Sequence, residues 1–324
     1  MHTFGYGYVG VSIFFILSGF VISHANANWR GWKRYLIGRA VRIYPSHWII
    51  LFSVAAYAVI TYFQQYGITV DSWLSLVANL TLVQAWVPDD KYYFSMDVVS
   101  WSLSVEIFFY ASFLFLRRLS DKSIYILSVS SYLVLIIAAV LLRHIWNDTI
   151  YWLFDINPVM RLPEFLIGMA LYRLYRAGKL PKLWLPKFNF ALILIGLVAT
   201  MTLIDWIPPS VVKFKWAYTY SIVPTLFAIF MIIALLDEKS NAYMRHKSLV
   251  LLGEASFALY LIHRPIIDYV NAFTRRYPID SGMTMVVLML SVMILCVYLS
   301  ILFYKDVELP LTKYLKRRFV DALV

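Results

Sequence analysis

Long apolar runs, separated by short polar segments, dominate this chain. Clear examples are residues 50–60, 133–142, 191–203 and 285–304. A helix needs about 20 mostly apolar residues to cross the hydrocarbon core of a bilayer. Backbone groups in lipid must bond internally, and the runs do not alternate with the period of two that a barrel strand requires. The pattern therefore predicts an all-α, polytopic transmembrane helical bundle.

The runs predict about nine membrane spans and one shorter segment. Residues 73–87 are apolar but short, so we expect a re-entrant or interfacial segment there. We find no internal repeat and no soluble region, so we expect a single integral-membrane domain over residues 1–324. The expected spans are 8–23, 46–63, 99–116, 123–142, 160–175, 188–206, 218–236, 249–270 and 284–304.

Composition and charge agree with a protein of the bilayer. Of the 324 residues 61% are hydrophobic and 15% charged, whereas soluble domains carry roughly a quarter charged residues. The net charge of +11 could indicate nucleic acid. However, 21 of the 29 Lys and Arg residues lie in one set of alternate loops, and only 7 in the other. Such asymmetry places the richer set, including tail 305–324, in the cytoplasm, and no nucleic acid partner is expected.

A few ionisable residues interrupt the predicted spans. Charged groups inside a membrane are costly and are therefore functional candidates. Glu106 lies in the sixteen-residue run that begins at Trp101, and His263 lies in the eighth span. Arg161 and Glu164 are three residues apart at the start of a span, and we interpret them as an ion pair that anchors a helix end.

Two arginines mark the approach to the second span. Arg39 and Arg42 share a helix face and are followed by Tyr44 and Pro45. We expect Pro45 to start the span, since proline suits the first turn of a helix. Ordinary positive-inside anchoring would explain such arginines if they stood alone.

Five ordered segments together resemble the membrane acyltransferase-3 family, whose members acylate sugars of surface polysaccharides and related glycans. The first, at residues 10–20, is similar to the family pattern G-V-x-x-F-F-x-x-S-G-F, and the second, at 39–45, matches R-x-x-R-I-x-P. The third, at 101–110, resembles W-S-L-x-x-E-x-x-F-Y, with its Phe-Tyr pair placed more loosely. The fourth, at 165–169, resembles F-x-x-G-M, and the fifth, at 253–265, resembles S-[YF]-x-x-Y-L-x-H-x-P.

The resemblance implies roles for particular residues. Arg39 and Arg42 would bind the phosphates of acyl-CoA, because arginine forks bind phosphate bidentately. Histidine titrates near neutral pH and suits a general base for a sugar hydroxyl. His2 lies near the family's catalytic histidine, and Glu106 could orient it or hold its protonated form. The motif positions without an assigned chemical step are Ser18, Gly19, Tyr44, Pro45, Trp101, Ser102, Tyr260 and His263.

The sequence departs from the family pattern in two places. Ser12 stands where many members have Asp, so no acidic role is carried over to it. Members also begin with a helix that holds an Arg ahead of the catalytic His, and that helix is absent here. With an outside start and an odd number of spans, we expect that the chain lacks the family's first helix.

These features together predict a membrane-embedded O-acyltransferase of the bacterial inner membrane, with a cytoplasmic C-terminus. It would move an acyl group from cytoplasmic acyl-CoA to a hydroxyl of a surface or exopolysaccharide sugar, and we expect that group to be acetyl. We expect acetyl-CoA as co-substrate, no bound cofactor and no metal, since the six His residues lack ligand-like spacing. A non-enzymatic transporter or flippase of lipid-linked saccharides remains the alternative at this point.

Overall fold

The computed structural model describes residues 7–53, 56–142, 145, 147–180, 193, 195–200, 222–236, 245–279 and 281–323. All regular elements among them are helical, as predicted. The chain forms two compact units, each built from two stretches of sequence. Unit 1 comprises residues 1–29 and 108–245, and unit 2 comprises residues 30–107 and 246–324.

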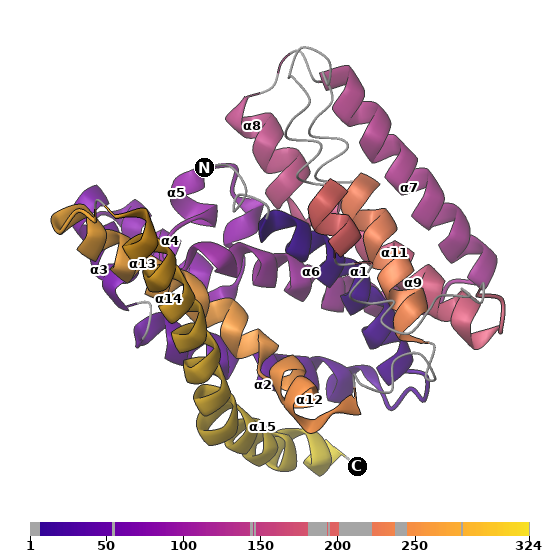
Figure 1. Cartoon of the computed structure of the whole chain (residues 1–324). Coiled ribbons are helices and arrows are strands. Elements are labelled where there is room, and N and C mark those ends of the chain that lie inside the picture. The colour runs from indigo at the N-terminus through magenta and orange to yellow at the C-terminus, as the bar shows by residue number, and fades with distance from the viewer. Residues whose placement is uncertain are drawn as a thin grey trace. The chain divides into compact units, whose positions relative to one another are not determined.

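Unit 1 is a helical cluster arranged around α9. Helix α9 packs along α1 and also contacts α7, while α11 packs against α1 (Figure 1). Its aromatic core stacks Phe109 on Phe165 and sets Phe15 edge-on to Phe109. The elements are α1 (Gly7–Ala25), the second half of α6 (Trp101–Leu116), α7 (Asp121–Leu142), α8 (Asp148–Tyr151), a π-helical turn (Trp152–Ile156), α9 (Pro158–Arg176) and α11 (Val223–Leu235).

Two glycines explain why α1 and α9 approach so closely. A Cβ atom at Gly19 would collide with the backbone of Phe165, and one at Gly168 would collide with the carbonyl of Ile16. Small residues allow backbones in a membrane to come together, where dispersion rather than hydrophobic burial holds helices. Gly19 therefore has a packing role, and the neighbouring Ser18 is buried in the same helix.

Unit 2 is built around α2, α13 and α14. Helices α13 and α14 pack together, and α13 also contacts α2 and α3 (Figure 1). The elements are α2 (Trp32–Phe52), α3 (Ala56–Tyr66), α4 (Val70–Thr81), the 3-10 turns Gln84–Trp86 and Val98–Ser100, α5 (Asp90–Tyr93), the start of α6, α12 (Lys247–Glu254), α13 (Ser256–Arg276), α14 (Gly282–Phe303) and α15 (Leu309–Leu315), with π-helical turns at Tyr304–Glu308 and Lys316–Val320 and a final 3-10 turn at Asp321–Leu323.

The structure confirms an all-helical architecture with candidate membrane spans but does not confirm nine spans. Among the described residues, three helices are long and apolar enough to cross a membrane: Val98–Leu116, Asp121–Leu142 and Gly282–Val320. The number rises to five if two bent pairs, α2 with α3 and α12 with α13, each count as one span. Helices α1 and α11 are apolar but shorter. Most of the expected span 188–206 lies outside the described residues.

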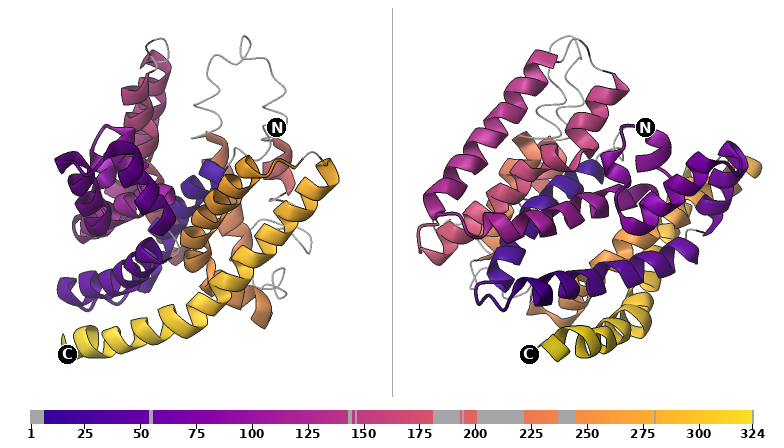
Figure 2. Two further views of the ribbon diagram at one scale, coloured as in Figure 1. Left: turned by 90° about the vertical axis from the view of Figure 1, so that its left-hand side faces the viewer. Right: turned by 180° about the vertical axis from the view of Figure 1, so that it is seen from behind.

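The last helix is much longer than a bilayer requires. Helical structure from Gly282 to Val320 covers 39 residues, or about 58 Å of rise against about 30 Å of hydrocarbon. The apolar part is α14, after which charged residues begin at Lys305 and Asp306. Figure 2 shows α14 running on through α15 to the C-terminus.

Pro45 lies inside a helix and not at the start of one, so the beginning of the second span at this residue stays a prediction. Helix α2 begins at Trp32 and continues through Pro45 to Phe52. A proline inside a helix removes one backbone hydrogen bond and usually kinks the helix, but membrane helices tolerate it where neighbouring groups compensate. Arg39, Arg42, Tyr44 and Pro45 therefore belong to one continuous helix.

Candidate active site

The start of α6 is fixed by a buried network of hydroxyl and amide groups. The Ser100 hydroxyl donates to the carbonyl of Asp97 at 2.7 Å and lies 3.0 Å from the amide nitrogen of Gln84, which donates to it. Asn79 of α4 donates to Ser95 at 2.6 Å. Satisfied buried polar networks hold a single geometry. The network thereby sets where the residues of the W-S-L-x-x-E segment point.

Two of the predicted motif residues meet across 158 positions of sequence. The hydroxyls of Ser102 on α6 and Tyr260 on α13 lie 2.7 Å apart. Tyr260 also reaches the carbonyl of Val99 at 3.0 Å, and Ser102 reaches the same carbonyl at 3.1 Å. The two hydroxyls thus share one acceptor and can exchange donor and acceptor roles. Trp101, the first residue of α6, is partly buried beside them.

Glu106 lies one helical turn beyond Ser102, on the same face of α6. Its side chain is buried. Its charge acts on Tyr260 of α13 and on Tyr35 of α2. Glu106 is therefore buried beside the polar cluster, and the catalytic role expected for it stays a prediction.

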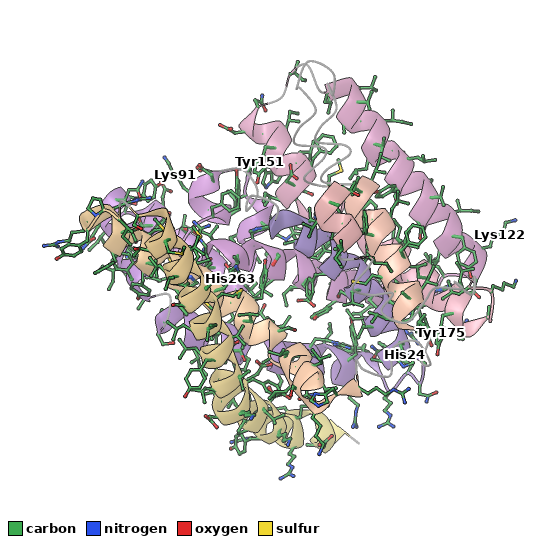
Figure 3. All side chains as sticks on the ribbon, in the orientation of Figure 1. His24, Lys91, Lys122, Tyr151, Tyr175 and His263 are labelled. Carbon is green, nitrogen blue, oxygen red and sulfur yellow. The ribbon has the colours of Figure 1, made fainter. Side chains whose placement is uncertain are left out.

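His263, labelled in Figure 3, lies on α13. It follows Tyr260 by one turn of that helix. The two rings are 5.8 Å apart, and His263 Nδ1 lies 3.1 Å from the carbonyl of Leu259. A proton on Nδ1, donated to that carbonyl, leaves Nε2 as the acceptor of the ring. The partly buried imidazole is therefore oriented by its own helix.

Asp97 is a member of this cluster that sequence analysis missed. Its side chain is 1% exposed, and neither carboxylate oxygen has a hydrogen bond to the described residues. The amide of Val99 lies nearby but outside hydrogen-bond geometry. Burial raises the pKa of Asp97 to about 7, while Arg264, itself paired with Asp268 at 3.1 Å, opposes that rise.

The backbone just before Asp97 is also unusual. Met96 has a φ of 60°, in the left-handed region that side chains other than glycine rarely adopt. Such conformations concentrate at functional sites, where the surrounding structure enforces them. Asp97 stands immediately before the apolar run of α6, and this position was the sequence signal that could have identified it. An acidic residue at the start of a membrane span is costly and is therefore a functional candidate.

The two predicted donor-binding arginines lie on α2. Arg39 is partly buried and stacks over the ring of Tyr35 at 5.8 Å, and Arg42 is exposed one turn further on. Tyr35 is influenced by both Arg39 and Glu106. One buried tyrosine thus lies within electrostatic range of both Arg39 and Glu106.

The second half of α2 holds α4 through side chains. Tyr44 donates to the carbonyl of Thr81 at 3.0 Å, and Trp48 donates to that of Leu80 at 2.9 Å. His47 Nε2 lies 3.0 Å from the carbonyl of Asn79. Carbonyls at a helix C-terminus have no partner within the helix. Tyr44 therefore has a structural role in capping α4.

Unit 1 contains a separate buried ion pair. Arg161 and Glu164 lie 3.2 Å apart, and Arg161 donates to the Ser12 hydroxyl at 2.9 Å. The Phe15 ring faces the guanidinium at 5.3 Å. A small pocket beside the pair is lined by Tyr132, Leu135, Phe154, Met160, Arg161, Pro163 and Glu164. His2, the predicted general base, lies outside the described residues.

Comparison with known proteins identifies the family. The sequence profile of the Acyltransferase domain family, acyltransferase-3, matches residues 2–305. The chain belongs to this acyltransferase family. Its membership and its apolar helices make it a membrane acyltransferase, as the five sequence segments predicted.

Relatives of this acyltransferase come from several bacteria. It is 27% identical to Acyltransferase MdmB of Streptomyces mycarofaciens, covering 98% of this chain and 84% of that protein. It is 28% identical to Exopolysaccharide production protein ExoZ of Rhizobium meliloti, covering 99% and 94%. It is 24% identical to O-acetyltransferase OatA of Staphylococcus aureus, covering 95% of this chain and 53% of that protein. No solved structure matches the chain.

Proposed function

We propose that this acyltransferase moves an acyl group from cytoplasmic acyl-CoA to a hydroxyl of a cell-surface or exopolysaccharide sugar. The acyl group that we propose is acetyl. The observation that carries the proposal is the family match through residues 2–305. The names of two relatives, an O-acetyltransferase and an exopolysaccharide production protein, support an acetyl donor and a saccharide acceptor. The same match favours an enzyme over a transporter of lipid-linked saccharides.

The enzyme would act as one domain in the bacterial inner membrane. Bacterial relatives support that location. The excess of Lys and Arg in alternate loops supports a cytoplasmic tail 305–324. That orientation gives the arginines of α2 access to a soluble, cytoplasmic donor.

The reaction joins a hydroxyl oxygen to the thioester carbonyl carbon and breaks the carbon–sulfur bond. The hydroxyl proton passes to a general base and then to the departing thiolate, so the products are an ester and free CoA. His2 would be the base, because imidazole can accept and return a proton near neutral pH. Glu106, buried one turn from Ser102, would orient that base or stabilise its charged form.

The donor would be held by its phosphates. Arg39 and Arg42 share a face of α2, and their guanidinium groups stay charged at any physiological pH. Tyr35, which is influenced by both Arg39 and Glu106, links this donor site to the acid of the polar cluster. A phosphate-bound donor would thereby be oriented toward the proposed chemistry.

Acetyl transfer can be tested in cells and with purified protein. Deleting the gene should remove acetyl esters from the surface glycan, and plasmid-borne parent protein should restore them. Glu106→Gln should lower transfer by about 10²–10⁴-fold if it supports proton transfer, whereas the exposed Asp148→Asn should match the parent. Equal glycan acetylation with and without the gene would contradict the proposed function.

The donor site has its own test. Arg39→Gln or Arg42→Gln should weaken acetyl-CoA binding about ten- to a hundredfold, the range for a lost charge-assisted hydrogen bond. Lysine at either position should rescue binding only partly, since it lacks the planar fork. Arg275→Gln, an exposed change at the end of α13, is the control. Unchanged acetyl-CoA affinity in both arginine variants would leave the pair as a topology anchor.

A further inference from the structure

The C-terminal segment, residues 304–323, packs on α2, the helix that holds Arg39 and Arg42. Its π-helical turns, α15 and the last 3-10 turn all contact α2 within unit 2. In Figure 1, α15 lies beside α2 at the same end of this unit. The family match ends at residue 305, so nearly all of this segment lies beyond the part that the family profile matches.

The C-terminal segment is held in a defined position. Asp321 bridges Arg34 of α2 at 3.1 Å. Val320 and Glu308 are buried although most of their neighbours are exposed. These contacts at both ends fix the intervening residues, including Lys316, against α2.

Lys316 is thereby brought close to two other cations. The charges of Arg39 and Arg42 both act on its ammonium group, although it lies more than 270 residues away in sequence. Positive groups held together repel one another unless an anion lies among them. The fold therefore keeps three cations together at a position where a multivalent anion would be attracted.

The carboxylates nearby do not neutralise Arg42 and Lys316. Glu308 acts on Arg42, and Asp321 acts on Lys316 but is already bridged to Arg34. The charge of Glu254 acts on Tyr304 instead. Among the described residues, neither Arg42 nor Lys316 has a carboxylate within salt-bridge distance. The cluster is thus suited to an external anion with more than one charge.

We propose that Lys316 completes a phosphate site with Arg39 and Arg42, so that the C-terminal segment binds the phosphates of the CoA donor. This inference rests on the proposed function. An anionic lipid headgroup has the same phosphate chemistry. The donor is favoured because Tyr35 connects Arg39 to Glu106 of the polar cluster, an arrangement that a lipid site would not need.

The test compares a donor that has phosphates with one that lacks them. In lipid-free detergent, Lys316→Gln should weaken acetyl-CoA binding about tenfold and flatten its dependence on salt, because one charge-assisted contact is lost. With S-acetylpantetheine, which has no phosphate, kcat/KM should equal that of the parent. Lys316→Arg should keep the affinity, and Lys313→Gln, exposed in the same segment, is the matched control.

Three outcomes would overturn the inference while leaving acyl transfer intact. These are unchanged acetyl-CoA affinity in Lys316→Gln, an equal loss of turnover with both donors, or weakened binding only to nanodiscs rich in phosphatidylglycerol. The proposed function fails separately if the parent protein transfers acetyl from neither donor. The two failures are distinguished by the activity of the parent with S-acetylpantetheine.

Discussion

Each unit buries a carboxylate, but only the one in unit 1 lies beside a cation that pairs with it. In unit 1, Glu164 lies 3.2 Å from Arg161, whose guanidinium also donates to Ser12 and faces Phe15. In unit 2, Asp97 is as deeply buried but has no hydrogen bond to either oxygen among the described residues. A buried acid can be stabilised by a partner or can favour its neutral form.

The contrast separates a structural acid from one that can change its charge. A cation beside a buried carboxylate favours its ionised form, and removing the cation leaves that charge uncompensated. An unpaired carboxylate exchanges its proton near neutral pH, which is useful in a site that must move protons. The position of Asp97 beside Tyr260 and ahead of Glu106 agrees with the second description.

The largest expected effect comes from breaking the pair in unit 1. Arg161→Leu leaves Glu164 buried without its cation and should cost about 3–5 kcal/mol of unfolding free energy. Thermal unfolding in detergent measures the loss. Removing both charges, as Arg161→Leu with Glu164→Leu, should recover most of the stability. A single variant as stable as the parent would show that the pair contributes nothing to the fold.

Neutralising Asp97 should raise the free energy of unfolding, whereas breaking the ion pair lowers it. Its pKa is about 7 in the folded protein and 3.8 without burial, so the folded state holds an extra proton between these values. Stability is therefore lost as the pH rises from about 4 to 7, and Asp97→Asn removes that loss. The variant should equal the parent near pH 4 and exceed it by on the order of 2–4 kcal/mol at pH 8.

The groups that face Asp97 define the controls for this pH dependence. Three side chains of α13 interact electrostatically with Asp97: Arg264, Asp268 and Tyr260. They are therefore left unchanged in both proteins. The exposed Asp148→Asn should shift neither end of the curve. Parallel stability curves for the parent and Asp97→Asn between pH 4 and 8 would contradict the raised pKa.

Sequence reasoning recovered the membrane architecture because apolar length is a local signal. The runs around α6, α7 and α14 were located to within a few residues of the helices. The motif residues Ser102 and Tyr260 were found through their segments. Their 2.7 Å contact was not, because it depends on packing between helices far apart in sequence.

Two sequence interpretations failed or fell short for physical reasons. Pro45 was expected to start the second span, but α2 runs through it unbroken because tertiary contacts outweigh local propensity. Asp97 was overlooked because an acid in a polar loop usually faces water. Only the structure reveals that the turn at Met96 carries Asp97 into the interior.

The smallest expected effect concerns the hydroxyl pair of unit 2. Tyr260→Phe should cost only about 0.5–1.5 kcal/mol, the net value of one hydrogen bond. In this variant the Ser102 hydroxyl still donates to the Val99 carbonyl, at 3.1 Å in the parent. No buried donor is therefore left without a partner. Thermal unfolding against Tyr298→Phe, an exposed change on α14, measures this. A loss comparable to that of Arg161→Leu would contradict the shared-acceptor arrangement. Because the fold tolerates the missing hydroxyl, a fall in acetyl transfer far beyond the stability change would assign Tyr260 to the reaction rather than to packing.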